Sequence, residues 1–385
     1  MVSCLWDKRG KEVSTPQKTT WEIEPHTLAK HEILRRYLGA WFPILGTAFQ
    51  NIVYIDGFCG PGRYDGGEVG SPIIALREAK KHRNRLQKNR LIFHFVDERP
   101  DRISQLNDEL EQIEVPDNFE IRPVARAFEH EFRDLLNNFD KDEFQKAPIF
   151  AFIDPFGFKG VPFDLVQKLL KKPRTEVFIN IMADSINRFL EHPDKVTRQH
   201  ISDLFGTTDV FKIAQDSGSR VEDLRLLYQE QLKKHAQFVR YFEMRNSKNR
   251  PIYYLFFATN NSLGHLRMKQ AFWKVDSASG VRFSDATNPN QLVLFELDES
   301  ETLAKELQNK FMNQKVQVKQ VRDFVINKTS FLPKHVTKAL RLLEKEKEIY
   351  VQTLKSDGNK RRKNSFPDEV IITFLSRVPK QRSLF

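Results

Sequence analysis

Apolar and polar positions follow two alternating rhythms along most of the chain. Five short apolar segments have the length of buried strands, and each is followed by a longer stretch with apolar residues at helical spacing. Strands alternating with helices are typical of a parallel sheet covered on both faces, so the fold class is α/β and Rossmann-like. The predicted strands are 51–55, 91–96, 119–124, 149–153 and 176–181, and the predicted helices are 72–83, 100–113, 128–139 and 162–171.

The flanks of this region follow other patterns. Residues 1–50 hold a polar segment and an amphipathic helix over Thr27–Leu45. Residues 184–248 read as largely helical and polar, which predicts a helical insertion after the fifth strand. The last two strands are then expected over 251–258 and 291–297, which brings the sheet to seven strands with a hairpin-like end.

A third pattern starts at about residue 301, so the sheet domain is predicted to span 51–300. Residues 301–385 contain three helical stretches and then two strand-like segments joined by a basic loop. Helices followed by a basic β-hairpin predict a winged helix-turn-helix, in which one helix enters a groove of nucleic acid and the wing touches phosphates. The five elements are 301–313, 315–327, 334–346, 348–354 and 370–377.

Positive charge is concentrated in this C-terminal region. The formal net charge is +11, and residues 301–385 hold 19 Lys and Arg against 9 Asp and Glu, which leaves +1 for residues 1–300. Such a concentration is typical of nucleic-acid-binding surfaces, although a solvated surface without a partner is the alternative. The residues expected to contact phosphates are Lys334, Lys338, Arg341, Lys355, Lys360, Arg361, Arg362 and Lys363.

The segment Asn51–Arg63 runs from the first strand into an acid and a glycine-rich turn. In doubly wound sheets such a turn holds nucleotide-like ligands at the carboxyl ends of the strands. It is neither a P-loop nor a clean G-x-G-x-x-G. An acid at the strand tip suits a ligand with an ammonium group and hydroxyls, so we predict S-adenosylmethionine (SAM); an ordinary strand–turn–helix corner is the alternative. The candidate residues are Asp56, Gly57, Phe58, Gly60, Pro61 and Gly62.

Two more acids close predicted strands. Asp97-Glu98 ends the second strand, where a carboxylate accepts hydrogen bonds from ribose hydroxyls. Asp154-Pro155-Phe156 ends the fourth strand, which lies beside the first. The alternative for Asp97-Glu98 is a solvent-facing acid pair, and the alternative for Asp154-Pro155-Phe156 is an Asp-Pro turn at a strand end.

The Asp154 motif is similar to the Asp/Asn-Pro-Pro-aromatic motif of amino-methyltransferases, without its second proline. There the acid and the first proline carbonyl accept hydrogen bonds from an exocyclic amine, and the aromatic ring stacks on a base that has left the helix. We therefore expect Asp154, Pro155 and Phe156 to orient the acceptor of a methyl group.

Other side chains give weaker signals. Phe128 follows the third strand and is expected to cover the adenine or to pack in the core, since no acid or amide stands there. Cys59 is interpreted as a small filler of its turn. The ten histidines show no metal-ligand spacing, so no metal site is predicted.

Composition excludes several classes. Aromatic residues are plentiful, with 32 Phe, so most of the chain is expected to fold. No apolar run is long enough to span a bilayer, and the N-terminus lacks the apolar core of a signal peptide. Two cysteines provide neither a disulfide framework nor a zinc site, which indicates a cytoplasmic protein.

Taken together, the motifs resemble the three-Cys-motif partner protein family (TcmP). The matching segments are Asp56–Gly62, Asp97-Glu98, Phe152–Gly157, Met268–Asp276 and Lys30–Leu38, and the resemblance covers about residues 20–355. It implies a class I, SAM-dependent methyltransferase domain followed by a winged-helix domain. It also implies a partner protein with a three-cysteine, radical-SAM-like motif.

The favoured interpretation is a SAM-dependent methyltransferase that acts on nucleic acid, DNA or RNA. Two alternatives stay open. The sheet domain can be a platform for a nucleic-acid-binding regulator, or it can carry another chemistry, such as a nuclease-like or base-modifying accessory to the three-cysteine partner.

Overall fold

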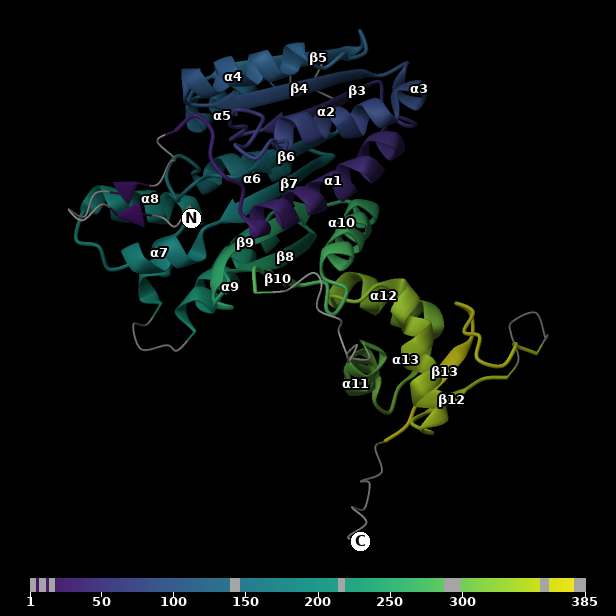
Figure 1. Cartoon of the computed structure of the whole chain (residues 1–385). Coiled ribbons are helices and arrows are strands. Elements are labelled where there is room, and N and C mark those ends of the chain that lie inside the picture. Colours follow the sequence, from purple (N-terminus) through teal and green to yellow (C-terminus); the bar gives the residue numbers. More distant parts are fainter. Residues whose placement is uncertain are drawn as a thin grey trace. The chain divides into compact units, whose positions relative to one another are not determined.

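The computed structural model of the 385-residue chain describes residues 5–6, 12–13, 18–138, 146–213, 219–286, 299–353 and 360–376. Packing divides the chain into two compact units (Figure 1). The first comprises residues 1–275 and 281–289, and the second comprises residues 276–280 and 290–385. Within the described residues, none of the helices has both the length and the apolar character needed to cross a bilayer.

An eight-stranded sheet forms the centre of the first unit, in the order β10-β8-β9-β7-β6-β3-β4-β5. The five strands from β7 to β5 are parallel, whereas β9 is antiparallel to both of its neighbours. A short antiparallel pair, β1 (Leu5–Trp6) and β2 (Glu12–Val13), precedes the sheet. The sheet strands are β3 (Asn51–Asp56), β4 (Arg90–Asp97), β5 (Phe119–Ala125), β6 (Ile149–Ile153), β7 (Thr175–Ile181), β8 (Phe238–Arg245), β9 (Pro251–Thr259) and β10 (Arg282–Ser284).

Helices cover both faces of the sheet. Figure 1 shows α1 beside α2 and α10 on one face, and α1 contacts both of them. This layer comprises α1 (Pro25–Leu45), α2 (Ser71–Lys81), α4 (Pro100–Glu111) and α10 (Ser262–Val275). The other layer comprises α5 (Phe128–Asn138), α6 (Phe163–Lys171), α7 (Ala183–Phe189), α8 (Lys195–Phe205) and α9 (Arg220–Lys233). The short helices α3 (Arg83–Leu86) and η2 (Thr208–Lys212) lie in connections.

The central strand shows why the predicted strands are apolar throughout. Val53 and Ile55 belong to the core under one helical layer, whereas Ile52 and Tyr54 belong to the core under the other. Side chains of successive strand residues point to opposite faces, so a strand covered on both sides needs apolar residues at every position. The α/β class expected from this pattern is confirmed.

The expected strand count and the extent of the helical insertion were wrong. β8 lies within residues 184–248, which we expected to be helical, and it forms an antiparallel hairpin with β9. Its sequence, FVRYFEMR, interrupts apolar residues with charged ones, and its buried and partly exposed positions do not alternate regularly, so the strand gives no clear periodic signal. β10 adds an eighth strand beside β8. The strand expected over 291–297 lies outside the described residues.

The second unit contains the predicted helices and wing strands. A three-stranded antiparallel sheet of order β11-β13-β12 packs with three helices around a core that includes Leu307, Val321, Leu340 and Ile372. β11 was not expected from the sequence, because three residues give no periodic signal. The elements are α11 (Glu299–Phe311), β11 (Lys315–Gln317), α12 (Val318–Lys328), α13 (Pro333–Lys345), β12 (Ile349–Val351) and β13 (Ile371–Phe374).

Candidate active site

β3 lies where the strand order of the sheet reverses. The chain continues from β3 to β4 on one side, whereas β6 pairs with β3 on the other side. In open α/β sheets, ligands bind outside the carboxyl ends of the strands at such a switch point. Asp56 and Asp97 end β3 and β4, and Asp154 follows β6, so the three acids selected from the sequence lie at the same edge of the sheet.

The glycine-rich turn after β3 is tightly constrained. Gly60 and Gly62 have φ angles of 61° and 81°, in the left-handed region that favours glycine. A Cβ atom on Gly62 would lie 2.7 Å from Cδ1 of Leu106, and one on Gly57 would lie 2.6 Å from the ring of Phe128. The turn therefore requires glycine both for backbone conformation and for close packing. Pro61, between the two left-handed glycines, is buried.

Asp97 fixes this turn to the end of β4. Its Oδ2 accepts a hydrogen bond from the backbone N–H of Gly60 at 3.2 Å, and its Oδ1 accepts one from the backbone N–H of Arg99 at 2.9 Å. Nη1 of Arg102 lies 3.5 Å from the same Oδ2, and this side chain is 1% exposed. Arg102 is therefore the cationic partner of the carboxylate that we expected to bind ribose hydroxyls. The neighbouring Glu98 is exposed.

Asp56 is fully buried beneath the turn. Its carboxylate accepts long hydrogen bonds from the Tyr54 hydroxyl, at 3.3 Å, and from the Phe58 backbone N–H, at 3.4 Å. Burial raises the pKa of Asp56 to about 7, and the nearby charge of Asp154 adds to the increase. A nearby cation would favour the ionised form of Asp56. Because the carboxyl group is fully buried, it would act on such a cation through its charge and not by direct contact.

Asp154 is held from two sides by residues that the motif analysis did not select. Lys30 on α1 donates to Oδ2 of Asp154, and Nδ2 of Asn180, near the end of β7, donates to Oδ1 at 2.8 Å. Asn180 is 3% exposed, and its Oδ1 has no hydrogen-bond partner among the described residues. A buried amide oxygen without a donor is unfavourable, so a ligand N–H or O–H group would satisfy it.

His31 lies beside this cluster. Its ring packs 5.7 Å from that of Tyr64, and burial, reinforced by the charge of Lys30, lowers its pKa to about 3. It is therefore neutral at physiological pH. Lys30 and His31 belong to the segment Lys30–Leu38 that carries the family resemblance, which was the one sequence signal pointing to them.

The aromatic candidates occupy different environments. Phe156 packs edge-on against Trp21 at 5.4 Å and lies 5.1 Å from the guanidinium of Arg102. Pro155 before it is buried. Phe128 is 4% exposed and stacks on Phe58 at 5.1 Å. Of its two expected roles, covering the adenine or packing in the core, the structure shows packing in the core.

Cys59 and the possible metal ligands were the remaining groups with chemical potential. Burial raises the pKa of the Cys59 thiol well above its usual value, which suits a filler of the turn and not a nucleophile. Among the described residues, no three His, Cys, Asp or Glu side chains lie together as metal ligands would.

In the second unit, most of the basic candidates are exposed. Three of them line one side of α13 and three lie in the wing, namely Lys334, Lys338, Arg341, Lys360, Arg362 and Lys363. Arg341 also donates to the backbone oxygen of Asn364 at 3.0 Å. Arg361 differs, because its side chain is 9% exposed and pairs with Glu344. It holds the wing against α13, which departs from the phosphate contact expected of it. Lys355 lies outside the described residues.

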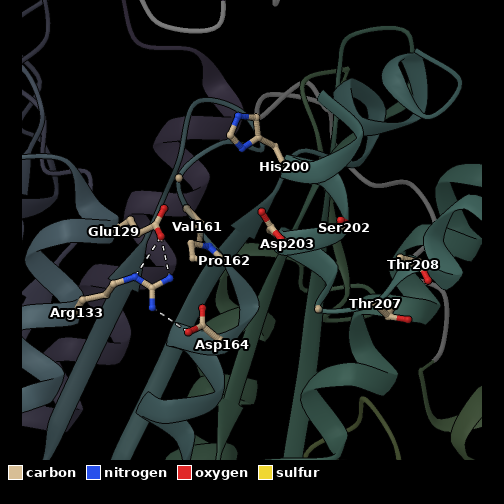
Figure 2. Close-up of a pocket in the computed structure, with 12 residues that line it drawn as sticks. Glu129, Arg133, Val161, Pro162, Asp164, His200, Ser202, Asp203, Thr207 and Thr208 are labelled. Atoms are coloured by element: carbon tan, nitrogen blue, oxygen red, sulfur yellow. Dashed lines mark hydrogen bonds and ion pairs between the residues drawn. The ribbon is translucent and has the colours of Figure 1, made fainter. Parts of the chain in front are cut away.

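Two cavities lie away from the three carboxylates. One, of about 480 Å³, opens between α5, α6 and α8 (Figure 2). Arg133 bonds Glu129 and Asp164 on one side of it, and His200 and Asp203 lie on the other. The second, of about 240 Å³, lies at the opposite edge of the sheet beside the buried Glu176. The lining of the first cavity includes Gly160–Pro162, which follow the Asp154 motif in sequence, but none of the three carboxylates.

Comparison with known proteins identifies one part of the chain. Residues 282–356 match the family described as the GMT-like wHTH domain, which agrees with the fold of the second unit. None of the curated proteins compared with the chain matches it. A crystal structure of a Klebsiella pneumoniae protein, provisionally described as an O-methyltransferase, is 13% identical with a TM-score of 0.31 and covers 62% of this chain and 92% of that chain. A likeness of this size does not establish a shared fold.

Proposed function

We propose that the first unit is a SAM-dependent methyltransferase and that the winged helix brings it to nucleic acid. The observation that carries this proposal is the convergence of Asp56, Asp97 and Asp154 at the carboxyl ends of β3, β4 and β6. The sheet order supports it, because an antiparallel β9 between β7 and β8 is the hairpin-like end expected of a class I methyltransferase sheet, with β10 added at the edge.

The residues present fit such a cofactor. At Gly60, where an added Cβ would meet only the Trp21 ring among the described residues, the left-handed turn leaves the backbone open to a ligand. Asp97 offers a carboxylate to the ribose hydroxyls once Arg102 yields its place. Bound SAM would supply an activated methyl group. The protein then contributes position, exclusion of water and a negative field from Asp56 beneath the turn.

The acceptor is proposed to be an exocyclic amine. Within the part of the chain that the structure describes, Oδ1 of Asn180 has no donor. Its amide pairs with the Asp154 carboxylate, so an oxygen of each side chain can receive one of the two N–H groups of an amine. These bonds would aim the nitrogen lone pair at the methyl group, and Asp154 can accept the proton that the nitrogen must lose. Lys30 offsets the charge of Asp154 while the site is empty of substrate.

The winged-helix unit supports nucleic acid as the target. Its exposed basic side chains on α13 and in the wing suit phosphate contacts. The TcmP resemblance further suggests that a three-cysteine, radical-SAM-like protein works with this chain. The two cysteines, which form no disulfide framework, suggest that the chain acts in the cytoplasm.

One observation favours the non-catalytic alternative. Asp97 has three protein partners, and Arg102 is almost fully buried against it. A permanent Arg102–Asp97 pair would leave the sheet as a platform, with nucleic-acid binding by the winged helix as the whole function.

The two functions differ in cofactor binding and methyl transfer. Calorimetry with S-adenosylhomocysteine (SAH) is expected to show binding to the intact protein and about tenfold or greater weakening in Asp97→Asn, since hydrogen bonds to a charged group contribute about 1.5–3 kcal/mol. The matched control is Asp108→Asn, because Asp108 is an exposed acid on the same helix as Arg102.

The second experiment measures methyl transfer. Incubation of the protein with methyl-labelled SAM and DNA or RNA should give labelled nucleic acid, and Asp154→Asn should abolish the transfer while SAH binding persists. No binding of SAH by the wild-type protein would leave the platform function.

A further inference from the structure

The segment Lys18–Trp21 lies across the loops that follow all three strands of the crevice. Its backbone oxygens accept hydrogen bonds from Asp65, after β3, and from Arg99, after β4. Trp21 reaches Phe156, after β6, with its ring. We call Lys18–Trp21 the strap. A segment that touches all three loops forms the outer wall of any ligand bound at the switch point.

The Trp21 ring closes this wall. It packs edge-on against Tyr64 at 5.5 Å and against Phe156 at 5.4 Å, and the guanidinium of Arg102 lies 4.9 Å from its centroid. The nearest atom to a Cβ built on Gly60 is also from this ring, at 3.7 Å. Trp21 therefore faces the left-handed turn and the Asp97–Arg102 pair at once.

We propose that Trp21 contacts the nucleoside part of the cofactor, and that the strap closes over it; this inference rests on the methyltransferase function proposed above. Arg102 is a planar cation that bonds Asp97 and stacks near two aromatic rings. A nucleoside offers the same two features, since its ribose hydroxyls can bond Asp97 and its planar base can lie against Trp21. Cofactor binding would thus replace Arg102 at both partners.

The attachments of the strap suit repeated opening. Thr19 donates to Asp101 at 2.7 Å, and Thr20 donates to Asp65. These two hydrogen bonds and the one from Arg99 to the backbone oxygen of Lys18 are exposed to solvent. Exposed hydrogen bonds contribute little net stability because water replaces them, so the strap can be released without disturbing the sheet.

Two measurements test the role of Trp21. Calorimetry with SAH is expected to show about tenfold weaker binding in Trp21→Ala, because one base–aromatic stack is lost, and nearly normal binding in Trp21→Phe. Intrinsic fluorescence should change when SAH binds, and this change should disappear in Trp21→Phe. Trp41→Phe is the matched control, since Trp41 lies on α1 beside the cavity at the opposite edge of the sheet and should keep the change.

The possible failures can be told apart. Wild-type protein that binds no SAH overturns both the methyltransferase function and this inference. Wild-type protein that binds SAH, with equal affinity in Trp21→Ala and a fluorescence change that persists in Trp21→Phe, overturns the inference alone. Circular dichroism of each variant would establish that weaker binding does not come from misfolding.

Discussion

The ammonium group of Lys30 on α1 is paired with the carboxylate of Asp154 at the end of β6, 124 residues away in sequence. Both side chains are largely buried, with 7% and 18% exposed. A helix that precedes the sheet in sequence therefore supplies the counter-charge of the proposed acceptor site. This pairing makes α1 part of the site and not only a cover for the sheet.

Removing Lys30 is expected to destabilise the protein. Lys30→Met leaves the Asp154 carboxylate with Asn180 as its one remaining side-chain partner among the described residues, which should lower the free energy of unfolding by about 3 kcal/mol. Urea denaturation measures the change. Lys168→Met, which breaks a surface pair with Asp164, should lower it by less than about 1 kcal/mol. The double variant Lys30→Met/Asp154→Asn should recover part of the loss; no recovery would mean that the two charges are not coupled.

Gly62→Ala should be more harmful than Gly160→Ala. Both glycines have positive φ angles, so alanine at either position costs about 1–2 kcal/mol of backbone strain. At Gly62 the added methyl group also meets Leu106, whereas nothing lies within 4 Å of it at Gly160. Thermal unfolding of the two variants compares them directly. Equal melting temperatures would argue against close packing beneath the turn.

Asp56 and His31 are expected to give stability opposite dependences on pH. Asp56 keeps its proton up to about pH 7 in the folded state but loses it near pH 3.8 when unfolded, so its contribution decreases as pH rises between these values. His31 has a pKa of about 3 when folded and 6.5 when unfolded, so its contribution is lost as pH falls below 6.5.

The variants Asp56→Asn and His31→Asn separate the contributions of the two groups to the pH dependence of stability. Urea unfolding at pH 5, 6 and 7 should show that Asp56→Asn loses more stability on acidification than the wild type, by up to about 1.4 kcal/mol per pH unit. His31→Asn should lose less. The same slope in the wild type and in both variants would contradict the burial of these groups in their neutral forms.

Arg361 and Arg362 are neighbours in sequence but should behave differently. Arg362→Ala removes an exposed charge, so it should weaken nucleic-acid binding and reduce the slope of log affinity against log salt by about 1 without changing stability. Arg361→Ala removes the partner of Glu344 and a donor to the backbone oxygen of Ser365, so it should lower the melting temperature. Nucleic-acid binding over a range of salt concentrations and melting curves of both variants distinguish the roles of the two arginines. Equal melting temperatures in the two variants would argue against the structural role of Arg361.

The sequence by itself determined the α/β class, the strand tips that carry Asp56, Asp97 and Asp154, and the helices and wing strands of the C-terminal unit. Those features are local, since buried parallel strands need apolar residues at every position and a glycine-rich turn needs glycine where it bends. β8 and β10 were missed because their partially exposed residues lack a clear period, and β10 is three residues long.

The tertiary structure decided which side chains surround those tips. Lys30, Asn180 and Trp21 come from separate segments that no spacing in the sequence brings to these acids, whereas Arg102 follows Asp97 by five residues on the next helix, α4. Folding alone places Lys30 on Asp154, 124 residues away in sequence, because buried carboxylates require partners and the chain supplies them from wherever the fold passes. The sequence therefore indicated a candidate site at these strand ends, and the packing of the folded chain determined which side chains pair with its carboxylates.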